Sequence, residues 1–207
     1  MKNLKAIENM IYPTKHLVIL FTALILFSAE VNAQDQPVDS DSLFNEGRRL
    51  FALSVEDKGQ IQPAIDLFEE IIEANEDFHA RALAYLGALY TIKAKHRFFP
   101  FDKLKWAKEG LSLLDDALFH APDNIEVLFV HGTICHQLPG LFKRQDDAQR
   151  DFNKIIELLP ANMHRYDEQF IAGVLDYLNE EIDLNKEDQT ALNKINSTYS
   201  IAAGESE

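Results

Sequence analysis

The chain has 207 residues, of which 46% are apolar and 26% charged, a balance typical of one folded globular domain. Acidic residues outnumber basic ones by 34 to 20, so the formal net charge is −14 at pH 7. Because an acidic surface repels phosphate backbones, we expect no nucleic-acid partner, and flat binding to anionic lipid is disfavoured. Cys135 is the single cysteine, so no intramolecular disulfide can form and packing must stabilise the fold.

The N-terminus has the pattern of a secretory signal peptide over residues 1–33. Three lysines lead into an apolar run from Leu17 to Phe27 that only Thr22 interrupts, and this run is shorter than the roughly 20 residues of a membrane-spanning helix. Small or modest residues follow up to Ala33, where we expect cleavage. The expected location is therefore periplasmic or secreted, as a soluble protein. The alternative is that the segment stays attached as a membrane anchor.

Residues 34–41 are polar and acidic with one proline, and we expect a short linker there. From residue 42 onward apolar residues recur at helical spacing almost throughout, and no convincing strand alternation occurs. The sequence therefore predicts an all-α fold.

One pattern occurs three times. It consists of a small residue, a large apolar residue four positions later, and a small or branched apolar residue three positions after that. The copies are Ala64, Phe68 and Ile71; Gly110, Leu114 and Ala117; and Ala148, Phe152 and Ile155. Pro122 and Pro160 follow the last two copies, where they would end the helix. Each copy is preceded by a predicted helix with a central glycine, Gly47, Gly87 or Gly132. This spacing predicts helical hairpins that cross closely at the glycines.

The pattern resembles the tetratricopeptide repeat family over about residues 42–160. The residues that match its signature directly are Leu86, Gly87, Tyr90, Ala117, Pro122, Ala148, Phe152 and Pro160, with Ala64 and Phe68 in the first copy. The resemblance implies a right-handed superhelix of about three to four hairpins over residues 42–182. The glycines are 40 and 45 residues apart, longer than the usual unit of 34. We therefore expect elongated turns inside the hairpins, over residues 54–62, 95–103 and 138–145.

Two further helices are expected after Pro160. Residues 163–181 form the seventh, and Asn185 is placed to cap the eighth. Residues 183–207 would then be a capping helix and a disordered tail, which we expect from residue 202.

The resemblance also implies a binding groove, because in this family the first helices of the hairpins line a concave face. The residues carried over to it are Phe44, Arg48, Phe51, Arg81, Ala84, Ala88, Thr91, Phe129, Thr133 and His136. Arg48 and Arg81 could hold a carboxylate of a partner, or they could pair with acids of this chain.

Two apolar–basic turns are the second candidate for binding. Their candidate residues are Arg97, Phe98, Phe99, Phe101 and Trp106 in the first turn, and Leu141, Phe142 and Arg144 in the second. The first turn could dock a partner, or its phenylalanines could fold back to fill the space between repeats. We favour the second, because three exposed phenylalanines are a liability. Membrane contact through residues 97–106 is a third option that the acidic charge disfavours.

No catalytic motif, phosphate-binding loop or cofactor site is evident, and we expect no enzyme activity. His131, Cys135 and His136 lie close together in the sequence, but Cys135 occupies a packing position of the repeat, which favours a buried cysteine beside a paired histidine over a metal site. The resulting hypothesis is an exported interaction or scaffold module that binds a protein or peptide of the cell envelope. The alternatives are a small-ligand-binding or accessory component of an envelope transport system, and a metalloprotein that uses these three residues.

Overall fold

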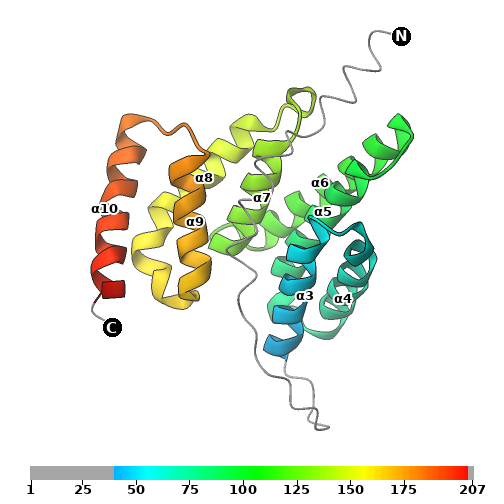
Figure 1. Ribbon diagram of the computed structural model, residues 1–207, viewed down its shortest axis with the longest axis horizontal. Coiled ribbons are helices and arrows are strands. Elements are labelled where there is room, and N and C mark those ends of the chain that lie inside the picture. The colour runs from blue at the N-terminus through cyan, green and yellow to red at the C-terminus, as the bar shows by residue number, and fades with distance from the viewer. Residues whose placement is uncertain (1–39, 205–207) are drawn as a thin grey trace.

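The computed structural model describes residues 40–204, and the side chains of residues 41–199. Within this part of the chain the protein consists of eight α-helices and four short 3-10 helices, without a strand (Figure 1). The expected all-α class is therefore confirmed. The expected signal peptide of residues 1–33 lies outside the described residues. Among residues 40–204, no helix combines the length and the apolar character needed to cross a membrane.

The α-helices follow one another with short connections. They are α3 (Ser40–Ser54), α4 (Ile61–Ala74), α5 (His79–Lys95), α6 (Pro100–His120), α7 (Ile125–Gln137), α8 (Gln145–Asn162), α9 (Glu168–Glu180) and α10 (Lys186–Gly204). Single 3-10 turns occur at Lys58–Gln60, Glu76–Phe78, Gly140–Phe142 and Met163–Arg165. Figure 1 shows α3 and α4 packed beside the longer α5 and α6, with α7 to α10 on the other side of that pair.

The helices pair as hairpins, α3 with α4, α5 with α6, and α7 with α8. The glycines lie where the two helices of each hairpin cross. A Cβ added to Gly47 would lie 2.9 Å from the Phe68 ring, and one added to Gly132 would lie 3.1 Å from the Phe152 ring. Gly87 and Gly110 face each other, and a Cβ on Gly87 would lie 2.6 Å from the Gly110 carbonyl oxygen. The expected close crossing at the three glycines is confirmed.

One continuous hydrophobic core runs from Phe44 to Ile195. The large residues of the three repeat copies, Phe68, Leu114 and Phe152, are each 0% exposed. Tyr85 stacks on Phe68 with ring centroids 5.1 Å apart. The repeated sequence pattern therefore marks the residues that join the two helices of each hairpin.

The helix ends differ from the sequence expectations in several places. Helix α6 begins at Pro100, so residues 100–103 of the turn expected over 95–103 are helical. Pro160 does not end its helix, since α8 continues to Asn162, whose side-chain amide donates to the Leu158 carbonyl oxygen at 2.9 Å. Helix α3 begins at Ser40, inside the expected linker, with Asp41 in its favourable first turn. Helix α10 extends to Gly204, so residues 202–204 of the expected tail are helical.

The cap at Asn185 is confirmed. Its side-chain oxygen accepts hydrogen bonds from the backbone N–H groups of Glu187 at 2.9 Å and Asp188 at 3.0 Å. Helix α10 packs against α8 and α9. The expected helix of residues 163–181 is divided into a 3-10 turn and α9, because Asp167 caps α9 by accepting from the Phe170 N–H at 2.7 Å.

Candidate functional site

Most of the expected groove residues are buried. Phe44 and Phe51 are each 1% exposed, Thr91 is 2%, Thr133 is 3% and Phe129 is 8% exposed, and Ala84 and Ala88 are also buried. The expectation that these side chains face an open groove does not hold, because neighbouring helices cover them. The ring of Phe44, for example, contacts those of Phe68, Phe78 and Tyr85. His136 is exposed, with its ring against those of Phe152 and Tyr177.

Arg48 and Arg81, the expected carboxylate-binding residues, face a carboxylate of this chain. Glu126 is 1% exposed and lies at the start of α7. It accepts a hydrogen bond from Nε of Arg81 at 2.6 Å and one from the Tyr85 hydroxyl at 2.6 Å, while Nε of Arg48 lies 3.4 Å away. The interpretation that the arginines pair with acids of this chain therefore holds, and the clamp for a partner's carboxylate does not.

Further contacts hold the two guanidinium groups of this Glu126 cluster in place. Arg81 lies over the ring of Phe44, 4.1 Å from its centroid, and Arg48 donates to Asp167 at 3.4 Å. Burial and the nearby Glu126 carboxylate raise the pKa of Tyr85, so this hydroxyl remains a donor. Sequence reasoning missed Glu126, although a single acid inside the apolar run of residues 125–130 was a signal of a buried, paired charge.

His131 is the centre of a second polar cluster, between α6, α7 and α8. It is 1% exposed, and its Nδ1 pairs with Asp151 while its Nε2 lies 3.1 Å from Asp115. Arg144 forms a bidentate pair with Asp115, with one of its two contacts at 3.0 Å. The sulfur of Cys135, which is 0% exposed, lies 3.8 and 3.9 Å from the two ring nitrogens.

The two carboxylates around His131 favour the charged form of its imidazole. Burial alone would lower its pKa, but the hydrogen bonds with Asp151 and Cys135 outweigh burial and raise it to about 10. Burial raises the pKa of Asp151 against the effect of His131, and with a carboxylate at each ring nitrogen we assign the proton to the imidazole. Both nitrogens thus face a carboxylate of this chain, and Nη2 of Arg144 also lies 3.1 Å from Nε2, so the imidazole is fully engaged within the cluster.

His136 does not join His131 and Cys135 in a common site. Among the described residues, no group of three or more histidine, cysteine, aspartate or glutamate side chains is arranged to hold a metal ion. The geometry thus fits a buried cysteine beside a paired histidine.

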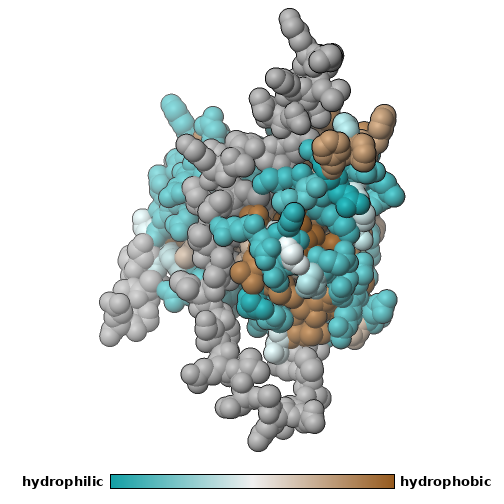
Figure 2. All heavy atoms as spheres, turned by 45° about the vertical axis from the view of Figure 1, so that its right-hand side comes forward, coloured by the Kyte–Doolittle hydropathy of each residue, from teal (hydrophilic) through white to brown (hydrophobic). Residues whose placement is uncertain are grey.

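The turn between α5 and α6 exposes its phenylalanines to solvent. Phe98 is 86%, Phe99 62% and Phe101 87% exposed, and Leu104 is 38% exposed. The favoured expectation that they fill the space between repeats is wrong. The chain is too short to fold back, because α5 ends at Lys95 and α6 begins at Pro100. Figure 2 shows a small hydrophobic knob at this end of the molecule, beside mainly hydrophilic atoms.

Residues 93–108, which we call the aromatic–basic tip, reverse the charge of the chain locally. They contain Lys93, Lys95, Arg97, Lys103, Lys105 and Lys108 and one acid, Asp102, a net charge of +5. The Trp106 ring packs against Tyr90 with centroids 5.0 Å apart and lies under the ammonium group of Lys93 at 4.1 Å. Arg97, with its guanidinium carbon 5.8 Å from the same ring, is exposed. Trp106 thus packs against Tyr90 and Lys93 and connects the start of α6 to the end of α5.

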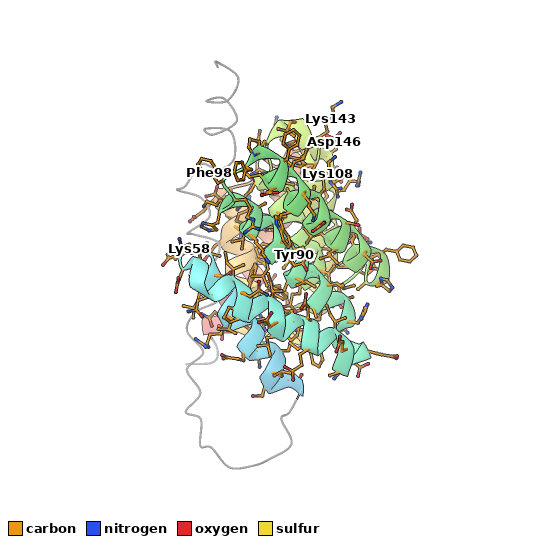
Figure 3. All side chains as sticks on the ribbon, turned by 90° about the vertical axis from the view of Figure 1, so that its right-hand side faces the viewer. Lys58, Tyr90, Phe98, Lys108, Lys143 and Asp146 are labelled. Atoms are coloured by element: carbon orange, nitrogen blue, oxygen red, sulfur yellow. The ribbon has the colours of Figure 1, made fainter. Side chains whose placement is uncertain are left out.

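The second turn, between α7 and α8, contributes less exposed apolar surface. Leu141 is 54% exposed, but Phe142 is half-buried against the core and Arg144 pairs with Asp115 and Asp147. In Figure 3, Lys143 of this turn lies at the same upper end of the molecule as Phe98 and Lys108. The two turns therefore share one end of the protein.

Comparisons with known proteins found no similarity: no protein-family model matches the chain, and neither a curated protein nor a solved structure does.

Proposed function

We propose that this chain is an exported, tetratricopeptide-like interaction module without catalytic activity, which docks onto a component of the cell envelope through the aromatic–basic tip. The observation that carries the proposal is the exposure of Phe98, Phe99 and Phe101, between 62% and 87%. Large exposed apolar side chains are a liability for a protein that has no partner for them, and clusters of them mark interaction sites.

The repeat assignment is supported by the register of the three hairpins. In each hairpin, the central glycine of the first helix contacts a residue of the repeat pattern in the second helix. Gly47 faces Phe68, Gly87 faces Gly110 and Leu114, and Gly132 faces Phe152. Under this proposal α3 to α8 form three repeats of a right-handed superhelix, and α9 with α10 closes the end of the array. A terminal helix of this kind covers the apolar face that the last repeat would otherwise expose.

The interaction role of the tip is supported because the other candidate side chains form ion pairs within this chain. Glu126 engages Arg48 and Arg81, and His131 has a carboxylate at each ring nitrogen. These groups stabilise the array of helices. The apolar side chains of the tip are left for a partner.

Co-sedimentation with isolated envelope material tests the proposal. A chain of residues 34–207 keeps every core side chain, because the core lies between Phe44 and Ile195, and circular dichroism will establish that it is folded. We expect the wild type to sediment with the envelope and a variant with Phe98, Phe99 and Phe101 changed to Ala to stay in solution. Phe119→Ala is the matched control, because Phe119 is 80% exposed elsewhere on α6, and it should sediment. A wild type that stays in solution, or a triple variant that sediments equally, would refute the proposed docking.

Export is tested separately by fractionating cells that make the full chain. Sequencing the N-terminus of the exported form should give Gln34 as the first residue. Protein that remains in the cytoplasm with Met1 would contradict export.

A further inference from the structure

We infer that the aromatic–basic tip docks on an anionic lipid surface, with the three phenylalanines among the lipid headgroups and the basic residues against the phosphates. This inference rests on the proposed docking role of the tip and names the component it binds. It goes against the sequence expectation, because the structure shows the phenylalanines exposed, and basic residues flank them in the sequence.

The apolar part of the tip is a small group of exposed aromatic side chains at one turn. Its apolar part consists of three phenylalanines within four residues at the end of a two-helix projection, with Leu104 behind them. Since an aromatic side chain buries roughly 150–250 Å², three of them at these exposures offer roughly 350–600 Å². A standard protein interface buries about 800 Å² on each partner, of which a little more than half is apolar, so area does not separate a protein from a lipid partner and the charge decides. A lipid interface accepts isolated aromatic side chains without a matching pocket.

The distribution of charge favours an anionic surface and limits contact to the tip. The tip carries +5 within a chain of −14, which leaves −19 on all other residues. An anionic bilayer attracts the tip and repels the remainder, so the protein would stand on the membrane on this one end. Lys105 is 67% exposed at its side chain and is free to approach headgroups, since its contact with Glu109 is long, at 3.9 Å.

The backbone that presents the phenylalanines is ordered before binding. Phe99 caps α6 in an extended conformation, Pro100 starts the helix, and the Lys103 N–H donates to the Phe99 carbonyl oxygen at 3.0 Å. Phe98 and Phe99 contact each other edge to face at 5.2 Å. A rigid turn loses little conformational freedom when it enters the interface.

Vesicle binding of residues 34–207 tests the inference, and the absence of residues 17–27 removes the apolar segment that would bind lipid by itself. The vesicles are phosphatidylcholine alone, or phosphatidylcholine with 30% phosphatidylglycerol as the probe of anionic lipid. Trp106 is the only tryptophan and lies in the tip, so its emission reports binding beside sedimentation. We expect binding to the anionic vesicles, weaker binding as salt is raised, and no binding to the neutral ones.

Two pairs of matched variants separate the apolar and the charged contributions. The triple Phe98→Ala, Phe99→Ala, Phe101→Ala variant should lose detectable binding, whereas Phe119→Ala should bind like the wild type. The double variant Lys103→Glu, Lys105→Glu should weaken vesicle binding at least about 25-fold. Each lysine lost near an anionic surface lowers affinity about fivefold, and two losses multiply. The same double change at Lys186 and Lys194, two exposed lysines of α10, alters net charge equally and should leave affinity within about twofold.

The outcomes distinguish the inference from the proposed function. The lipid inference would be overturned if the wild type bound neutral and anionic vesicles equally well. It would also be overturned if the two double lysine variants lost vesicle affinity to the same extent. A third outcome is tip-dependent retention on envelope material that protease treatment of that material abolishes and that anionic vesicles do not reproduce. This outcome would identify an acidic protein partner. It would overturn the lipid inference and leave the proposed function standing. No binding to vesicles or envelope would overturn both.

Discussion

Replacing Gly87 with alanine tests whether the hairpins depend on close contact between their backbones. The added Cβ would lie 2.6 Å from the Gly110 carbonyl oxygen, 2.9 Å from Cγ of Leu114 and 3.0 Å from the Leu114 nitrogen. Ordinary contacts of this kind begin at 3.4 Å, so α5 and α6 must separate by about 0.8 Å. Two of these obstacles are backbone atoms, and a rotamer change cannot remove them.

The expected cost follows from two opposing effects. Overpacking of a dense core costs about 1–3 kcal/mol, and backbone obstacles place Gly87→Ala at the upper end. Alanine regains about 1 kcal/mol of helix propensity. The net loss in free energy of unfolding should be about 2 kcal/mol, or roughly 4–8 °C in Tm for a chain of this size.

Urea denaturation followed by circular dichroism measures this loss, with two controls. Gly47→Ala should cost less, about 0–1 kcal/mol, because its obstacle is the end of the Phe68 ring, which can tilt. Gly140→Ala should be neutral within about 0.5 kcal/mol, because nothing lies within 4 Å of an added Cβ. If Gly87→Ala proves as stable as Gly140→Ala, the close crossing of α5 and α6 is not a constraint and the reasoning fails.

Three further predictions concern polar groups. Glu126→Gln should lower the free energy of unfolding by about 2–4 kcal/mol, because Arg48 and Arg81 are left facing a neutral amide; a loss below about 1 kcal/mol in urea denaturation would contradict this. The wild type should be more stable than His131→Asn by a constant amount below pH 6.5, and this advantage should decline as pH rises toward 10. The reason is that folding raises the pKa of His131 from 6.5 to about 10, so the stabilising proton is lost across this range. Denaturation curves at pH 6 to 10 measure this advantage, and one that stays constant or grows would argue against a charged imidazole. Asn185→Ala should cost about 1 kcal/mol and speed amide exchange in the first turn of α10, and unchanged exchange there would show that the cap is not needed.

The helices and their pairing could be predicted from the sequence because both depend on local spacing. The triplets that begin with Ala64 and Ala148 place three apolar residues on one helix face, and the glycines mark the facing helix. Helix ends were less predictable. Pro160 was expected to end α8, but the helix continues two residues beyond it, to Asn162.

The polar clusters could not be predicted from the sequence because their members come from different helices. Glu126 meets Arg81 across 45 residues and Arg48 across 78, and no sequence spacing reports such a pair. The exposure of Phe98 was also missed, because three exposed phenylalanines are a liability and burial was therefore expected. The shortness of the α5–α6 connection, which decides the matter, became clear only when both helix ends were known.

The Glu126 cluster bears on how the array unfolds. In a linear array each unit stabilises its immediate neighbours, and such proteins can lose terminal units one at a time. Here Arg48 of α3 contacts Glu126 of α7, and thus skips the intervening α5–α6 hairpin, while it also reaches Asp167 at the start of α9. Fraying of α3 would therefore leave the Glu126 carboxylate with one cation fewer in the third hairpin. This long-range ion pairing couples the first hairpin to the third and favours a single cooperative transition over stepwise loss of hairpins.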